Sequence, residues 1–194
     1  MMKIDTFHKY GLTLSRLQMN EIEMLRQWRN DPKISKFMTN DAFITYEQQI
    51  EWFETIKNKT DAFYFIVYLN KIPIGYSAIK NIDWKTKQGE TGDFMYIPKY
   101  IKNPILPCLK AYLTYDFYFE HIGLNGTYSY VKKDNLKSQQ YCNGIGYKYI
   151  EEKENFYYYT LSKDNYISNK TKFLKIIMKN ENWSNIINEF DIIY

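Results

Sequence analysis

The alternation of hydrophobic and polar positions divides the chain into a continuous series of strands and helices. Strands are predicted at residues 11–17, 62–69, 74–82, 92–97, 127–131 and 156–161. The apolar run at residues 63–69 is typical of a strand that is buried on both faces. Three successive strands in the middle of the chain favour an antiparallel meander.

Helical periodicity fills the intervals between these strands. Ile22, Leu25 and Trp28 recur on one helical face, and Asp31-Pro32 ends that helix because the residue before proline avoids the helical region. Further helices are predicted from Thr45 onward, at 105–122 and at 135–143. We therefore expect an α/β (α+β) fold with a mixed sheet of about six to seven strands and flanking helices.

The end of the chain predicts an appendage to this domain. Residues 172–179 and 183–190 have the pattern of two C-terminal helices. We therefore expect one domain over residues 1–167 and a helical extension over residues 168–194. The role of this extension stays open at this point.

Composition narrows the class of protein. Hydrophobic residues make up 45% and charged residues 25% of the 194 residues, as in ordinary globular proteins, and aromatic residues reach 19%. No apolar run is long enough to span a bilayer, and none follows the N-terminus as a secretory signal would. Cys108 and Cys142 do not make a disulfide framework, so we expect a reduced, cytoplasmic protein.

Charge and histidine content limit the kinds of site. The net charge of +4 is too small to predict a nucleic-acid partner, but it is compatible with an anionic small substrate. Of the two histidines, His121 is expected to end a helix before Gly123. We expect no metal site and no membrane span.

Five short motifs then occur in an order that resembles the GNAT family of N-acyltransferases. The chain reads WRNDP at 28–32, WF at 52–53, IPIG at 72–75 and GDFMYI at 92–97. Asn135 and Ser138 open a last segment that ends at Gly146-Tyr147. The resemblance covers residues 12–161, and its opening is most similar to the branch that acetylates nucleotide-linked aminosugars for flagellin or surface glycans.

The resemblance implies the GNAT fold and acetyl-CoA as co-substrate. The acceptor amine would attack the thioester directly in a ternary complex, and proximity supplies much of the rate. The pantetheine arm would enter a splay between residues 92–97 and 127–131. The residues that we expect to bind acetyl-CoA are Met95, Tyr96, Ile97, Lys102, Asn103, Ile105 and Asn135.

The proton donor falls on a departure from the family pattern. Counting from Asn135 and back from Gly146 places the family's tyrosine at position 142, where this chain has Cys142 beside Tyr141. A shift of one residue turns a helical side chain by about 100°. Tyr141 or Cys142 is therefore the expected donor of a proton to the departing thiolate.

The acceptor side is expected at the first helix and the lining strand. Arg29 and Asn30 would contact the sugar or its phosphates, since Arg is well shaped for phosphate oxygens. Glu90 is the expected base for the amine, with Asp93 as the alternative.

The loop before the long helix departs from the family as well. Residues 102–107 contain no glycine, and Pro104 and Pro107 have no N–H for a diphosphate. Lys99, Lys102 and Lys110 would supply positive charge in its place. The glycine-free loop and the displaced tyrosine favour an alternative function, a GNAT-shaped binding module without catalysis. Acetylation of a protein N-terminus is a second alternative. The acceptor, the acyl chain and a homodimer stay open.

Overall fold

The strands form one mixed sheet in the computed structural model, which describes residues 5–38, 40–97 and 105–178. All neighbouring strands are antiparallel except the parallel pair β5 and β6. The order across the sheet is β1 (Thr6–Lys9), β2 (Leu12–Arg16), β3 (Phe63–Leu69), β4 (Ile72–Asp83), β5 (Gln88–Met95), β6 (Gly126–Lys132), β8 (Phe156–Ser162) and β7 (Lys148–Lys153).

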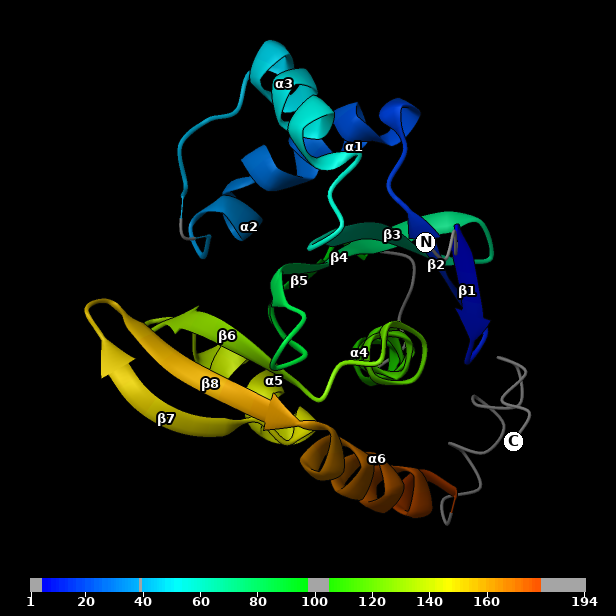
Figure 1. Cartoon of the computed structure of the whole chain (residues 1–194). Coiled ribbons are helices and arrows are strands. Elements are labelled where there is room, and N and C mark those ends of the chain that lie inside the picture. Colours follow the sequence, from blue (N-terminus) through cyan, green and yellow to red (C-terminus); the bar gives the residue numbers. More distant parts are fainter. Residues whose placement is uncertain (1–4, 39, 98–104, 179–194) are drawn as a thin grey trace.

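Helices cover both faces of this sheet (Figure 1). A 3₁₀ turn (Met19–Glu21) leads into α1 (Ile22–Asn30), which lies with α2 (Pro32–Ser35) and α3 (Tyr46–Ile56) on one face. The other face holds α4 (Leu106–Asp116) with its π-helical continuation (Phe117–Ile122), α5 (Leu136–Ile145) and α6 (Lys163–Met178). Two hydrophobic clusters result, one under each set of helices.

The alternation along β3 shows why both faces are apolar. Tyr64 and Ile66 pack in the cluster of α1 and α3, whereas Phe65 and Val67 pack in the cluster of α4. Successive strand residues point to opposite faces, so an uninterrupted apolar run is what a doubly covered strand requires. The expected mixed α/β fold is confirmed.

The sheet has eight strands, whereas the sequence predicted six or seven. The additional strands are β1 and β7, which lie at the two edges. All six residues of β7 are exposed, so it has no buried face that would alternate with a polar one.

The long predicted helix is confirmed as α4 with its π-helical continuation. It ends at Gly123, whose φ of 80° is the left-handed C-cap conformation. In the described part of the chain, no helix is long and apolar enough to cross a membrane.

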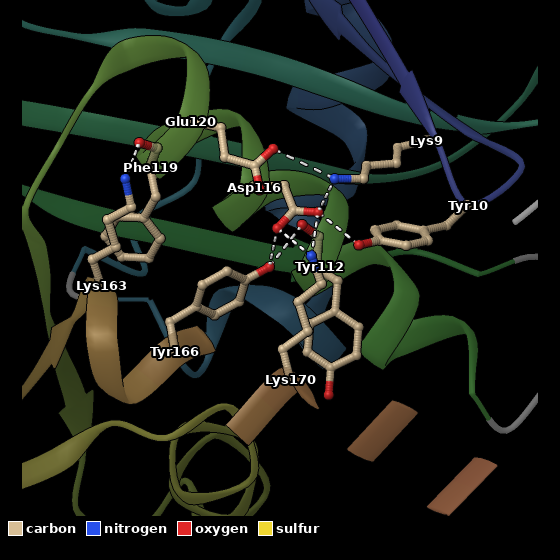
Figure 2. Close-up of polar contacts among 9 residues, drawn as sticks. All are labelled: Lys9, Tyr10, Tyr112, Asp116, Phe119, Glu120, Lys163, Tyr166 and Lys170. Carbon is tan, nitrogen blue, oxygen red and sulfur yellow. Dashed lines mark hydrogen bonds and ion pairs between the residues drawn. The ribbon is translucent and has the colours of Figure 1, made fainter. Parts of the chain in front are cut away.

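A buried carboxylate ties the C-terminal helix to the rest of the fold. Figure 2 shows Asp116 of α4 between the β1–β2 turn and α6. Its carboxylate accepts from the Tyr10 hydroxyl at 2.6 Å and the Tyr166 hydroxyl at 2.7 Å, and pairs with the Lys9 and Lys170 ammonium groups at 2.6 Å each. The helix predicted at 172–179 is part of α6, which begins at Lys163. It therefore crosses residue 168, where we expected the domain to end and the C-terminal extension to begin. Residues 183–190 lie outside the described residues.

Candidate active site at the gap between β5 and β6

The parallel strands β5 and β6 pair only at their first residues. Their register runs from Gln88 opposite Gly126 to Glu90 opposite Tyr128, and it stops there although β5 continues to Met95. The expected splay is therefore confirmed, and it opens toward the C-terminal ends of the two strands.

The main chain of β5 leaves hydrogen-bonding groups at this gap. The Tyr96 N–H donates to the Ile74 carbonyl of β4 at 2.9 Å, and the Lys87 carbonyl accepts from the Asn125 N–H beside β6 at 2.8 Å. Main-chain groups alternate between the two edges of a strand. The main-chain N–H and C=O groups of Asp93 and Met95 therefore face the gap. The Tyr96 N–H is thus committed to β4, and a contact of Tyr96 with a pantetheine arm through its other groups stays a prediction.

A buried ion pair lies beneath the splayed part of β5. The Lys110 ammonium of α4, whose side chain is 2% exposed, is 2.9 Å from the Asp93 Oδ1, whose side chain is 11% exposed. Ser77 of β4 donates to Asp93 and accepts from Lys110 at 3.3 Å. The expectation that Lys110 supplies charge to a diphosphate is therefore wrong, because its ammonium is taken up by Asp93 inside the core.

Two polar atoms beside this ion pair are buried without a hydrogen-bond partner among the described residues. They are the Oδ2 of Asp93, which is an acceptor, and the Oη of Tyr141 on α5. Burial, and then the charge of Asp93, raises the pKa of Tyr141 well above its usual value, so the hydroxyl keeps its proton. An unpaired acceptor and an unpaired donor each carry a desolvation cost that a ligand would remove.

The residues next to Tyr141 are already satisfied or apolar in character. Cys142 is 4% exposed in the hydrophobic core, and burial raises the pKa of its thiol to about 12. The Tyr147 hydroxyl bonds to those of Thr91, Thr127 and Tyr115 at 2.8 to 3.0 Å. Of the two expected proton donors, Tyr141 therefore offers the stronger one, an O–H group without a partner among the described residues.

Glu90 and Asp93, which the sequence left as alternatives, lie on opposite faces of the sheet. Asp93 contacts α4, and Glu90, an odd number of residues away, points to the side of α1 and α3. The Glu90 carboxylate lies 2.8 Å from the Lys80 ammonium and accepts from the Asn81 amide at 2.9 Å. Both residues belong to β5, but the Asp93 side chain lies on the face of α4 and the Glu90 side chain on the face of α1 and α3.

Aromatic rings join α1 to the end of β5 on this second face. The Trp28 ring stacks on that of Tyr96 with centroids 5.2 Å apart, and the Tyr96 hydroxyl donates to the Asp31 Oδ2 at 3.1 Å. A hollow of about 340 Å³ lies here, with Asn30, Asp31, Phe43 and Tyr96 in its lining. The structure thus brings Tyr96 to Asn30, one of the two expected acceptor residues, whereas Arg29 is not part of this lining.

Arg29 and Asn30 end α1 in different environments. The Arg29 guanidinium lies 5.9 Å from the Trp52 ring of α3. The Asn30 amide donates to the Ile44 carbonyl and accepts from the Ile44 N–H, both at 2.9 Å. Asn30 therefore fixes the segment before α3 to α1. Both polar atoms of its side chain are engaged in these two hydrogen bonds.

The remaining expected contacts to acetyl-CoA are spread around the start of α4 and α5. Ile105 precedes α4 and is 5% exposed, and Ile97 packs against the same core. Asn135 caps α5, where its Oδ1 accepts from the Ser138 N–H at 3.1 Å, so the amide Nδ2 is its remaining donor. Lys102 and Asn103 lie outside the described residues.

Sequence reasoning missed the cluster around Ser77 and Lys110. The available signal was a single lysine in a helix where every other residue from Leu109 to Tyr115 is hydrophobic or Thr. Such a lysine is rarely buried without a carboxylate partner.

Comparisons with known proteins bear on this site. Residues 11–148 match a family model described as acetyltransferase (GNAT) domain. A relative named acetyltransferase PseH, from Campylobacter jejuni, is 27% identical over 149 residues, which are 77% of this chain and 90% of the relative.

Solved structures share the fold. One described as apo FdhC, a nucleotide-linked sugar GNAT, has a TM-score of 0.74 at 22% identity and covers 87% of this chain and 96% of its own. Campylobacter jejuni PseH in complex with acetyl coenzyme A has a TM-score of 0.60 at 22% identity, with coverage of 78% and 99%. A spermidine N-acetyltransferase from Vibrio cholerae, in complex with CoA and spermine, has a TM-score of 0.69 at 15% identity, with coverage of 81% and 98%.

Proposed function

The chain belongs to the GNAT acetyltransferase family, and from that premise we propose that it transfers the acetyl group of acetyl-CoA to the amine of a nucleotide-linked aminosugar. Acetyl transfer is supported by the relative named acetyltransferase PseH, and a nucleotide-linked sugar as acceptor is supported by the likeness to a structure described as a nucleotide-linked sugar GNAT. The observation that carries the proposed site is the unpartnered pair of polar atoms on Asp93 and Tyr141 beside the gap between β5 and β6.

The free edge of β5 fits the pantetheine arm of acetyl-CoA. That arm carries amide groups, and the main chain of Asp93 and Met95 presents hydrogen-bonding groups that β6 does not take. The side chain of Met95 packs on the core beneath. Further proposed contacts are Ile97, Ile105, Asn135 and, outside the described residues, Lys102 and Asn103.

Tyr141 is the proposed proton donor. Acetyl-CoA supplies an activated acetyl carbon and a thiolate leaving group, whose thiol has a pKa of about 8.5. Tyr141 keeps a protonated hydroxyl with no acceptor among the described residues, so it has a hydrogen bond to give to developing negative charge. Cys142 is the weaker candidate, because its thiol lies in the apolar core.

The acceptor approaches from the face of α1 and α3. Glu90 points to this face and is the proposed base for the amine, with Lys80 holding its carboxylate in place. Arg29 is the proposed contact to the acceptor's phosphates, and Asn30 positions the segment that borders it.

Two free thiols and the co-substrate agree with a cytoplasmic location.

A binding measurement and an acceptor panel test the proposal separately. Acetyl-CoA at about 100 times its Kd adds about 2.7 kcal/mol to the free energy of unfolding, which a thermal shift detects. Thiol release is then compared for UDP-linked aminosugars, a ribosomal-protein N-terminal peptide and spermidine. The aminosugar arm alone should release thiol. Preference for the peptide would support the N-terminal alternative, and no thermal shift at millimolar acetyl-CoA would sink the proposed site.

A further inference from the structure

A second cavity lies at the opposite end of the sheet from the gap between β5 and β6. It has a volume of about 610 Å³, within the range of small-molecule sites. Its lining includes the end of β2, the start of β3, the residue after β4 and the end of the π-helical turn. Since β5 and β6 part toward the end where β5 finishes, the acetyl-transfer site does not account for this cavity.

Several aromatic rings stand in the walls of the cavity. Phe63, Trp84, Phe117 and His121 all contribute, and the Phe117 and His121 rings stack with centroids 5.8 Å apart. Trp84 is 46% exposed, so a large indole ring stands at the surface without full cover. Flat rings on several sides favour a planar apolar group as the occupant.

The charge of the lining is positive. Arg16, Lys57 and Lys59 contribute three cations, against the single carboxylate of Asp5. Lys57 pairs with Glu54 outside the lining, whereas Arg16 and Lys59 form no ion pair with any described residue. The cavity therefore has cationic groups to offer to an anion.

Arg16 is held in a fixed and half-buried position. Its guanidinium lies 4.8 Å from the Phe63 ring and 5.8 Å from the Phe65 ring, and it donates to the Ala62 carbonyl at 3.5 Å. Burial lowers the pKa of this guanidinium from its usual value, which is the cost of removing it from water. A stacked arginine with most of its N–H groups unused is ready for bidentate contact with an anion.

We propose that this cavity is a second ligand site, which takes a planar aromatic ring bearing a phosphate or carboxylate. The anion pairs with Arg16 and, at the rim, with Lys59. The ring lies against Trp84 and Phe63. The site is independent of the acetyl-transfer chemistry, because its residues come from the other end of the sheet.

Phenyl phosphate is the probe, with inorganic phosphate and phenol as the anion-only and ring-only arms. Calorimetric titration uses the full chain with CoA in excess, so that the transfer site is not available to the probe. We expect phenyl phosphate to bind with a Kd of about 1 mM or below and about tenfold tighter than either half molecule. Quenching of tryptophan fluorescence by the probe should vanish in Trp84→Phe.

Arg16→Gln should weaken phenyl phosphate binding at least about tenfold, whereas Arg26→Gln on α1, a matched loss of charge elsewhere, should leave it unchanged. Trp84→Ala and Lys59→Gln alter exposed parts of the lining and keep the test decisive if Arg16→Gln does not fold. Binding that survives all three lining variants, phosphate alone binding as tightly as phenyl phosphate, or no binding below about 10 mM would each overturn the proposal.

Discussion

Breaking the Asp93–Lys110 pair one partner at a time separates its contribution to the fold from its contribution to catalysis. Asp93→Asn leaves the Lys110 ammonium, with its side chain only 2% exposed, without an anion. A buried charge deprived of its partner costs about 3 to 5 kcal/mol. We expect the lower figure, because Ser77 still accepts from Lys110 and the Asp93 side chain is 11% exposed.

Lys110→Met produces the converse state, in which Ser77 is the one hydrogen-bond partner left to the Asp93 carboxylate among the described residues. We expect a loss of about 3 kcal/mol here as well. The double variant Asp93→Asn/Lys110→Met removes both charges and should recover about 2 kcal/mol relative to additive losses. Urea unfolding of the four proteins measures these free energies.

Acetyl transfer should not recover with stability. The double variant still lacks the unpartnered anionic Oδ2 beside the gap between β5 and β6, so its kcat stays as low as that of Asp93→Asn. A double variant that regains the wild-type rate would show that the pair only supports the fold. Strictly additive losses of stability would contradict the buried pairing itself.

The proton donor and the C-terminal anchor provide two more predictions. Tyr141→Phe should slow thiol release about 100-fold, and Cys142→Ala should leave it nearly unchanged; equal losses would refute the assignment of Tyr141. Burial favours the neutral form of Asp116, but hydrogen bonds from Lys170, Lys9 and Tyr10 outweigh it and lower its pKa. Asp116 therefore stabilises the fold above the unfolded value of about pH 3.9, and this contribution is lost as pH falls through the folded pKa. Asp116→Asn should cost about 3 kcal/mol near pH 7, and urea unfolding should find a smaller difference near pH 3; a constant difference would contradict this linkage.

The elements with a buried face were predictable from the sequence. The apolar run of β3 requires helices on both sides, and the left-handed cap at Gly123 ends the helix where expected. The edge strands β1 and β7 were not predictable in the same way, because β7 has no buried residue and its pairing with β8 supplies its order.

The site was predictable in position and only partly in detail. Motif order gave β5 and α5 as its walls, and the alternation of a strand already implies that Glu90 and Asp93 point to opposite faces. The choice of which face of β5 packs against α4 depends on contacts between residues far apart in the sequence. The pairing of Lys110 with Asp93 depends on the same contacts. Asn30 illustrates the same limit, since its partner Ile44 is 14 residues away in an irregular segment.

Gly92 provides the most direct test of the claim that the reacting groups meet beside the gap between β5 and β6. It lies on β5 beyond the last residue paired with β6, and a Cβ built there meets none of the described residues within 4 Å. Gly144 on α5 has the same free space and is the matched control. Thiol release should be abolished in Gly92→Leu and retained in Gly144→Leu, with wild-type melting temperatures in both. Wild-type transfer by Gly92→Leu would contradict the account.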